Sequence, residues 1–213
     1  MARSGFGPCD FQSRTGVSRE TLDKLQVYAG LLVKWQGSVN LVGKSTLPRL
    51  WQRHFYDSAQ LYQYLISPGP LIDLGAGAGF PGLVLAAMGR DDVTLIESSR
   101  KKCSFLREVA GRLSLNVNIF QERIEALEAR PNARYIVSRA LAPLDKLLFY
   151  SWPLLSEDGT CIFLKGRDVE TELTDAEKNW KIQLEIHPSA SDAEGIILTI
   201  GGLEPRNDEF ISK

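Results

Sequence analysis

Four glycines close together, at positions 75, 77, 79 and 82, give the sequence its clearest chemical signal. They lie in the segment LIDLGAGAGFPG, where an apolar run stops at a glycine-rich turn. Glycine tolerates a positive φ and lets a ligand approach the backbone closely. Gly77, Gly79 and Gly82 also match the pattern G-x-G-x-x-G. The segment therefore predicts a strand, a turn and a helix beginning near Pro81, with a small polar ligand bound at the turn.

Two carboxylates beside this turn help to distinguish the ligands that it could hold. Asp73 stands just before the glycines, where its charge would repel the pyrophosphate of a dinucleotide and attract a cationic ligand. S-adenosylmethionine carries a sulfonium and an ammonium group and has no phosphate. Glu97 ends the next predicted strand, about 20 residues beyond the turn, where an acid can accept hydrogen bonds from ribose hydroxyls; a solvated strand-end carboxylate is the other interpretation. The charges favour S-adenosylmethionine, and a dinucleotide remains open.

The rest of the sequence lacks residues that competing reactions need. A short-chain dehydrogenase uses a Tyr with a Lys four residues later, and none of the six tyrosines has one. The Asn-Pro-Pro-aromatic signature of exocyclic amine methylation is absent, and Cys161 falls inside a predicted strand. Transfer of an activated methyl group mainly requires an acceptor held in line with it. The sequence therefore lacks nothing that methyl transfer requires. The alternatives are an NAD(P)-dependent reductase and a non-catalytic RNA-binding or assembly module.

Hydrophobic periodicity predicts the elements that must position these residues. Strands that alternate with helices indicate an α/β fold with a mainly parallel, seven-stranded sheet. A short polar loop joins the last two strands, so a hairpin can form and leave one antiparallel strand at the edge. Helices are predicted over 18–35, 46–65, 99–113, 143–155 and 170–180, and strands over 71–74, 93–96, 117–120, 135–138, 160–164, 182–186 and 196–200.

The domain organisation follows from these elements. We expect a loose tail over the first 17 residues, a helical cap that extends to residue 69, and a Rossmann-like domain over 70–213, all forming one compact unit. Residues 1–70 hold 8 Lys/Arg against 4 Asp/Glu, whereas residues 160–213 hold 6 against 11. A polyanion would bind at the N-terminal part and the rim of the sheet, although a solvated basic face explains this bias equally well.

Composition excludes several classes of protein. No run approaches 18 apolar residues, which argues against a membrane span, and the N-terminus lacks an apolar signal region, which predicts a cytoplasmic location. The three cysteines show no C-x-x-C spacing, so neither a disulfide framework nor a metal site is predicted.

Seven segments carry a family resemblance that extends, in order, from about Leu22 to Gly166. They are NLVG, RHFYDSAQL, LIDLGAGAGFPG, LIESSRKKCSFLRE, IFQERIEAL, IVSRALAPL and FLKG. Together they closely resemble the bacterial small-subunit rRNA guanine-N7 methyltransferases, the RsmG (GidB) family. The resemblance implies a Rossmann-like class I methyltransferase fold with an N-terminal helical extension. It also implies methyl transfer from S-adenosylmethionine, which leaves S-adenosylhomocysteine, to N7 of guanine 527 in the 530-loop region of 16S rRNA. The expected partner is this RNA, either free or within the small ribosomal subunit or an assembly intermediate, and the protein is expected to be a monomer.

The resemblance also implies roles for individual residues. Cofactor contacts are expected at Gly75, Phe80, Ile124, Glu125 and Arg139, and the residue types add Asp73, Gly77 and Glu97. Candidates for positioning the substrate are Arg139, His54, Asp57, Asn40 and Lys165.

Several of these positions also have a structural interpretation. Arg139 could form a salt bridge with Asp73 or Glu125, His54 could be a core residue, and Arg53 with Asp57 could be a helix-surface pair. The family pattern also leads us to expect Asn after Trp35. Gln36 stands there, and we expect it to weaken a local turn contact. Beyond Gly166 the resemblance fades, and it implies no site residue over 167–213.

Overall fold

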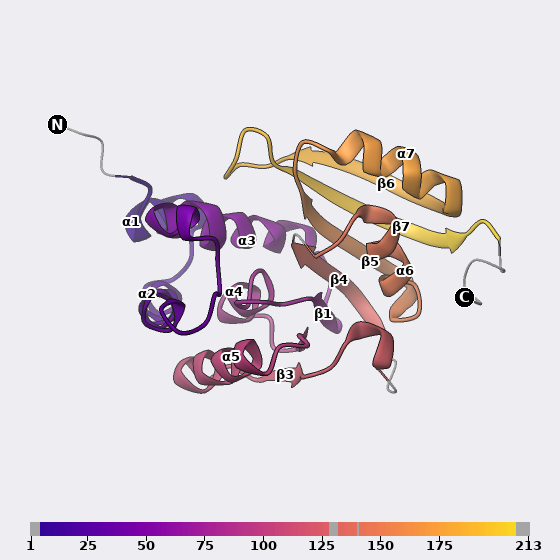
Figure 1. Ribbon diagram of the computed structural model, residues 1–213. Coiled ribbons are helices and arrows are strands. Elements are labelled where there is room, and N and C mark those ends of the chain that lie inside the picture. Colours follow the sequence, from indigo (N-terminus) through magenta and orange to yellow (C-terminus); the bar gives the residue numbers. More distant parts are fainter. Residues whose placement is uncertain (1–4, 128–131, 140, 208–213) are drawn as a thin grey trace.

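A computed structural model describes residues 5–127, 132–139 and 141–207. Seven strands form one sheet in the order β3-β2-β1-β4-β5-β7-β6, with helices on both faces (Figure 1). The neighbouring strands are parallel except where β7 pairs with β5 and β6. The predicted Rossmann-like α/β sheet is therefore confirmed. Its strands are β1 (Leu71–Leu74), β2 (Val93–Ile96), β3 (Val117–Phe120), β4 (Ala133–Arg139), β5 (Leu155–Lys165), β6 (Trp180–Pro188) and β7 (Ile196–Pro205).

Two hydrophobic clusters hold the helices against the sheet. Along β1, Leu71 belongs to the first cluster, and Ile72 and Leu74 belong to the second, as the two-residue repeat of a strand requires. Both faces of β1 are therefore covered, which explains its continuous apolar run. Helices α2 (Arg19–Gln36), α4 (Gly82–Ala87) and α5 (Arg100–Leu113) contribute to the first cluster, and α6 (Leu144–Ser151) and α7 (Val169–Asn179) contribute to the second.

Strand β7, which is antiparallel to both of its neighbours, lies one position inside the edge of the sheet. The sequence predicted an antiparallel strand at the edge itself. After β5 the chain passes through α7 and forms β6 as the outermost strand; the hairpin then returns β7 into the gap beside β5. This arrangement gives β7 hydrogen-bonding partners on both sides. Because Ile196 pairs with Lys165, the last residue of β5, the preceding β6–β7 loop (189–195) lies at the carboxyl edge of the parallel strands.

The N-terminal tail contains a helix that the sequence did not predict, α1 (Pro8–Thr15). Pro8 suits the first turn, and the Asp10 carboxylate accepts a hydrogen bond from the Gly7 amide at 2.9 Å. Phe11 is fully buried, with its ring centroid 5.5 Å from that of Trp51. The expectation of a loose tail is wrong over these residues because burial of one aromatic ring holds the short helix in place.

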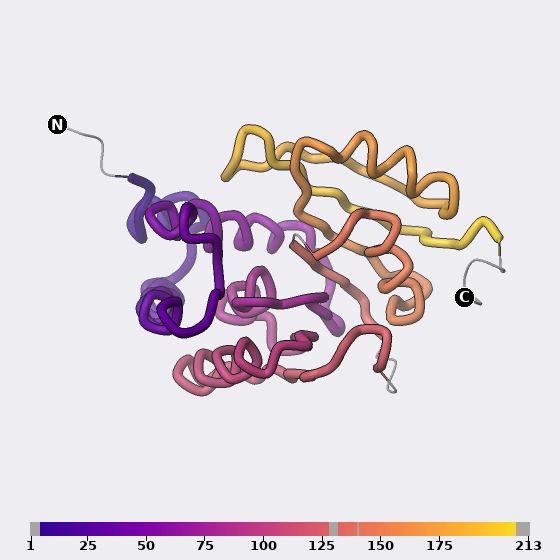
Figure 2. Tube along the Cα trace, in the orientation of Figure 1, coloured from indigo at the N-terminus to yellow at the C-terminus, as the bar shows by residue number. Residues whose placement is uncertain are grey.

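The predicted second helix is a helical segment that changes pitch. It comprises the 3₁₀ turns η1 (Lys44–Arg49) and η3 (Gln60–Tyr64), the π-helical turn η2 (Trp51–Tyr56) and the short α3 (Asp57–Ala59). In Figure 2 this purple segment runs beside the yellow β6–β7 loop. Turns of the π type are frequent at functional sites, and this one carries Arg53 and His54.

Gln36 stabilises the turn after α2, so the expectation that it weakens this turn is wrong. Its Oε1 accepts hydrogen bonds from the amides of Leu41 and Val42, both at 3.1 Å, and its Nε2 donates to the Val42 carbonyl at 2.8 Å. The amide side chain is long enough to reach peptide groups five and six residues away, which a pattern of residue types does not reveal.

The part of the chain that the structure describes contains no helix long and apolar enough to cross a membrane. Within the same residues, no group of three or more His, Cys, Asp or Glu side chains could hold a metal ion. Cys161 is fully buried in β5, and burial raises its pKa to about 12. Its thiol is therefore a core group and not a nucleophile.

Candidate cofactor and substrate site

A cavity of about 910 Å³ opens at the carboxyl edge of the sheet. Gly75 follows β1, Glu97 follows β2 and Arg139 ends β4, so three neighbouring strands deliver residues to it. Phe80 lines the cavity between two sets of residues that differ in chemistry. The glycine wall consists of 75–78, Ile96, Glu97, Ile124 and Glu125, and the charged wall consists of Arg53, His54, Asp57, Arg139 and Asp192.

Most backbone amides of the glycine turn already have acceptors. Gly77 N donates to Glu97 Oε2 at 2.9 Å, Gly79 N donates to Ala76 O at 2.7 Å, and Gly82 N donates to Asp73 Oδ2 at 2.8 Å. The φ angles of Gly75, Gly77 and Gly79 are 69°, 58° and 92°, which require glycine. A pyrophosphate needs free amides at such a turn, so the turn suits a ligand without phosphate.

Glu97 is held in place by the turn that it faces. Its Oε2 accepts from Gly77 N, and its Oε1 accepts from Ser99 N at 2.7 Å. The residue is only 8% exposed, so it is not a freely solvated strand-end carboxylate. A carboxylate has about four lone-pair sites, which leaves capacity for two hydroxyl donors from the cavity. The geometry therefore suits the recognition of a ribose.

Asp73 lies behind the turn and does not line the cavity. It is fully buried, its Oδ2 accepts from Gly82 N, and its Oδ1 has no hydrogen-bond partner among the described residues. Burial raises its pKa to about 7, while the Gly82 hydrogen bond and Arg139 act in the opposite direction. Asp73 can thus influence a bound cation through its field, but it makes no direct contact across the cavity surface.

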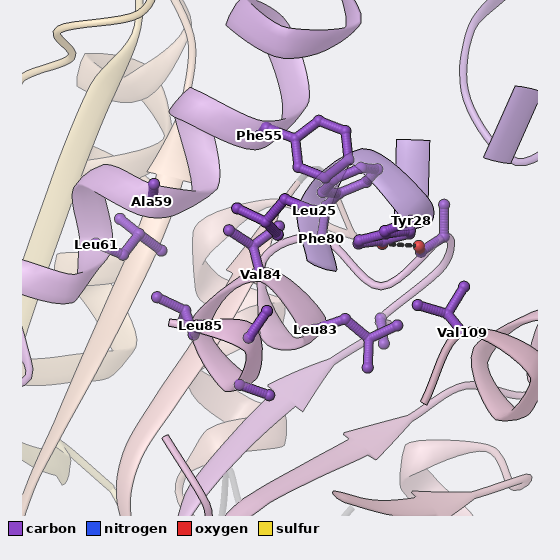
Figure 3. Close-up of a cluster of buried hydrophobic side chains, with 14 of the residues drawn as sticks. Leu25, Tyr28, Phe55, Ala59, Leu61, Phe80, Leu83, Val84, Leu85 and Val109 are labelled. Atoms are coloured by element: carbon purple, nitrogen blue, oxygen red, sulfur yellow. Dashed lines mark hydrogen bonds between the residues drawn. The ribbon is translucent and has the colours of Figure 1, made fainter. Parts of the chain in front are cut away.

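Helix α2 braces the turn from the side opposite to the cavity. The Tyr28 hydroxyl donates to the Ala78 carbonyl, and the Tyr28 ring stacks on Phe80 with centroids 5.3 Å apart (Figure 3). Phe55 meets the Phe80 ring edge-on at 5.3 Å. Phe80 is only 3% exposed. The N-terminal extension therefore fixes the position of Phe80 in the cavity.

Ile124 and Glu125 reach the cavity from the short turn η4 (Ile124–Ala126). Glu125 accepts a hydrogen bond from the Tyr150 hydroxyl, and this bond is the main cause that lowers the Glu125 pKa. Glu125 is therefore an ionised side chain held by α6. Within the described residues, neither Glu125 nor Asp73 forms the salt bridge with Arg139 that was its structural alternative.

Arg139 pairs with Asp57 instead. Its Nη1 lies 3.7 Å from Asp57 Oδ2 and donates to the Arg53 carbonyl at 2.9 Å. Its guanidinium carbon lies 5.1 Å from the centroid of the Phe80 ring, within the range of a cation–π contact. Arg53 itself pairs with Asp192, and not with Asp57 as the alternative of a helix-surface pair required. Each change joins residues from distant parts of the chain.

His54 is a neutral residue of the charged wall. The Thr46 hydroxyl donates to the Gly43 carbonyl at 2.7 Å, so His54 Nε2, which lies 2.8 Å from that hydroxyl, must carry the proton and donate. Burial, Arg139 and Arg53 lower the His54 pKa to about 3. His54 is 6% exposed and lies against Phe80, so it forms a wall of the cavity without carrying charge.

Two predicted residues have other engagements. Asn40 is exposed and does not line the cavity; its neighbour Leu41 does. Lys165 lines the cavity, but its ammonium pairs with Glu172 and donates to the Ala142 carbonyl at 3.0 Å. Asn40 therefore lies apart from the other candidates. The ammonium group of Lys165 is already neutralised by Glu172.

The C-terminal region, for which the resemblance implied no site residue, also contributes to the cavity. Glu172, Asp192 and Gly195 line it, the last two from the β6–β7 loop. Sequence reasoning missed them because the resemblance ended at Gly166. The signal that could have found them is the predicted hairpin, since its turn must lie at one end of the sheet.

An S-adenosylmethionine molecule fits the chemistry of this cavity. The glycine wall offers a carboxylate for ribose hydroxyls, apolar side chains for a base, and few amides for phosphate. The structure resembles that of the glycopeptide N-methyltransferase MtfA complexed with S-adenosyl-L-homocysteine, with a TM-score of 0.61, 10% identity, and coverage of 69% of this chain and 89% of that chain. Fold and site together define a class I S-adenosylmethionine-dependent methyltransferase.

Sequence comparison identifies the family within this class. The family model for rRNA small subunit methyltransferase G (GidB) matches residues 21–195. The ribosomal RNA small subunit methyltransferase G of Paramagnetospirillum magneticum is 51% identical over 194 residues, which cover 91% of this chain and 94% of that protein. The protein of the same name from Rhodospirillum centenum is 47% identical, with coverage of 94% and 93%. The chain belongs to the rRNA small subunit methyltransferase G family.

Proposed function

We propose that this protein transfers a methyl group from S-adenosylmethionine to N7 of a guanine in the 530-loop region of 16S rRNA. Family membership supports the RNA substrate. The observation that carries the proposal is the pairing of two unlike walls in one cavity: a glycine wall with few free amides, and a charged wall with an arginine at the end of β4. The first suits the cofactor, and the second suits a nucleotide.

Most of the predicted residues that line the cavity belong to one of these two walls, and Phe80 lies between them. The Glu97 carboxylate is placed to accept from ribose hydroxyls, and Phe80 and Ile124 offer apolar surface. We assign the cofactor to Gly75, Gly77, Phe80, Glu97, Ile124 and Glu125, with Asp73 acting through its field, and the guanine to Arg139, His54 and Asp57.

The chemistry makes few demands on side chains. Bound S-adenosylmethionine supplies a methyl group already activated on a sulfonium sulfur. Guanine N7 has a free lone pair and no proton to lose, so the protein needs to align the base and requires no general base. His54 agrees with this, because its low pKa makes it a poor base at neutral pH. Arg139 can donate to guanine O6, which leaves N7 open.

Mapping the transferred methyl group tests the proposal. The protein would be incubated with labelled S-adenosylmethionine and either small-subunit particles or naked 16S rRNA that lacks the modification. We expect label at one guanine N7 in the 530-loop region. Calorimetry with S-adenosylmethionine and with NADPH separates the alternatives. Binding of NADPH alone would indicate a reductase, and cofactor binding without methyl transfer to either substrate would indicate an RNA-binding or assembly module.

The setting of the reaction is part of the same proposal. We infer a monomeric protein that acts in the cytoplasm on 16S rRNA, either free or within the small subunit or an assembly intermediate. We also infer that the helical cap (1–69) and the Rossmann-like domain (70–213) form one folding unit. The first hydrophobic cluster supports this inference because it contains Tyr28 and Phe55 from the cap and Leu83 and Phe105 from the domain.

A further inference from the structure

Arg139 keeps hydrogen-bond donors that no described residue uses. A guanidinium has five N–H donors, and Arg139 uses Nη1 both for its hydrogen bond to the Arg53 carbonyl and for its pairing with Asp57. Its Nε and Nη2 have no acceptor among the described residues, yet neither is among the buried unpartnered atoms. Because the side chain is 19% exposed and lines the cavity, these donors remain accessible to a ligand.

Asp57 is shared between Arg139 and the β6–β7 loop. Its Oδ2 faces Arg139 Nη1 at 3.7 Å. Its Oδ1 accepts hydrogen bonds from the Ser191 hydroxyl at 2.5 Å and from Gln60 Nε2 at 3.1 Å. The carboxylate is therefore held at one oxygen and leaves the other for the guanidinium.

The β6–β7 loop is itself docked firmly on the helical segment. Gln52 Nε2 donates to the Ser191 carbonyl at 3.0 Å, the Ala190 amide donates to Gln60 Oε1 at 2.8 Å, and Asp192 pairs with Arg53. Ser191 is only 3% exposed. A buried hydroxyl with several polar neighbours holds one orientation, so the loop fixes Asp57 across a gap of 134 residues.

We propose that Asp57, held by Ser191 of the β6–β7 loop, is the positioning residue that aims the unused donors of Arg139 at the target guanine. This inference rests on the proposed function. It extends the site to a loop for which the family resemblance implied no residue.

The charge of Asp57 also suits the reaction. Methylation at N7 makes the guanine cationic, and a lone guanidinium beside it would oppose this charge. With Asp57 at 3.7 Å, the pair with Arg139 is neutral overall, and Arg53 with Asp192 forms a second neutral pair. The charged wall can therefore donate hydrogen bonds to the base without presenting a net positive charge to it.

A double-mutant cycle tests the positioning role. Ser191→Ala removes one donor to a buried carboxylate, and Asp57→Asn removes the charge. We expect kcat for guanine methylation to fall about tenfold in the first variant and further in the second, as loss of a charge-assisted hydrogen bond implies. S-adenosylmethionine affinity and the KM for RNA should stay within about threefold of wild type. In the Asp57→Asn background, Ser191→Ala should have no further effect on kcat. The Asn oxygen still accepts from Ser191 and Gln60, but the amide NH₂ then faces Arg139 and cannot pair with it.

Glu194→Gln is the matched control. Glu194 belongs to the same loop, but its ion pair with Arg167 is exposed, so this variant should keep wild-type kcat. Losses from Ser191→Ala and Asp57→Asn that multiply, or a Ser191→Ala variant with the kcat of the control, would overturn the positioning role. A wild-type protein that leaves guanine N7 unmethylated would instead overturn the proposed function, and this inference with it. Should Asp57→Asn fail to fold, the kcat values of Ser191→Ala and Glu194→Gln still test the positioning role.

Discussion

The two walls of the cavity are built in different ways. The glycine wall depends on a short stretch of chain, since Gly77 and Glu97 are 20 residues apart and follow neighbouring strands. The charged wall joins partners as distant as Arg53 and Asp192, which are 139 residues apart. The first wall is thus defined largely by local sequence, whereas the second forms only when the whole chain has folded.

The walls also differ in how their polar groups are satisfied. In the glycine wall, the Gly77 amide and the Glu97 carboxylate satisfy each other, so the turn is rigid before a ligand binds. In the charged wall, Arg139 keeps unused donors among the described residues. This contrast predicts that substitutions in or behind the glycine wall affect folding and cofactor binding. Substitutions in the charged wall should instead affect how the substrate is positioned.

The largest effect is expected for Gly82→Ala, directly behind the glycine wall. A Cβ there would lie 2.4 Å from Leu95 Cδ2 and 2.7 Å from Asp73 Oδ2, and both residues are fully buried. Overpacking of this kind lowers the free energy of unfolding by about 3 kcal/mol. Gly111→Ala in α5 is the control, since nothing lies within 4 Å of its Cβ; we expect it to stabilise by about 0.5–1 kcal/mol. Equal unfolding free energies for the two variants in urea would contradict this account.

Glu97→Gln should produce the next largest effect, on cofactor affinity. The substitution removes the charge, and the new amide NH₂ must face either Gly77 N or Ser99 N, which are both donors. We expect S-adenosylmethionine to bind about 30-fold more weakly by calorimetry, equivalent to about 2 kcal/mol. Glu108→Gln, which breaks only an exposed pair with Arg112, should bind like wild type. Unchanged affinity in Glu97→Gln would remove Glu97 from the cofactor site.

The sequence predicted the fold and the glycine wall because both depend on short-range patterns. Apolar runs indicate the strands, and Gly75 and Glu97 directly follow β1 and β2, whose neighbouring positions follow from parallel topology. The charged wall could not be predicted in the same way. The partner of Arg139 is Asp57 and not Asp73 or Glu125, because the π-helical turn and the β6–β7 loop bring residues together over distances that residue spacing does not encode.

Tyr28→Phe tests the connection between the helical cap and the glycine wall. The substitution removes the hydrogen bond from the Tyr28 hydroxyl to the Ala78 carbonyl but keeps the ring on Phe80. A buried carbonyl that loses its donor costs about 1 kcal/mol. We therefore expect a single thermal transition at a lower Tm and cofactor affinity weakened several-fold. Two separate transitions would show that the cap and the Rossmann-like domain unfold independently.

The smallest effect concerns pH, where the two walls should oppose each other. His54 in the charged wall has a folded pKa of about 3, below its ordinary 6.5, so below pH 6.5 protons bind preferentially to the unfolded state and stability falls with acid. Asp73, behind the glycine wall, has a folded pKa of about 7, above its ordinary 3.8, so from pH 7 down to 3.8 protons bind preferentially to the folded state and stability rises. Between pH 6.5 and pH 3.8, the contributions of His54 and Asp73 to the free energy of unfolding therefore nearly cancel in the wild type.

Single variants should reveal each contribution. In Asp73→Asn the term from His54 remains, and the free energy of unfolding should fall, relative to wild type, by about 1 kcal/mol between pH 6.5 and pH 5.5. In His54→Gln the term from Asp73 remains, and the free energy should rise by about the same amount. Other groups, such as Asp57 with its raised pKa, are present in all three proteins, so their contributions cancel in the comparison. Urea unfolding at several pH values measures these slopes, and parallel profiles for the two variants would mean that His54 and Asp73 do not titrate in opposite senses.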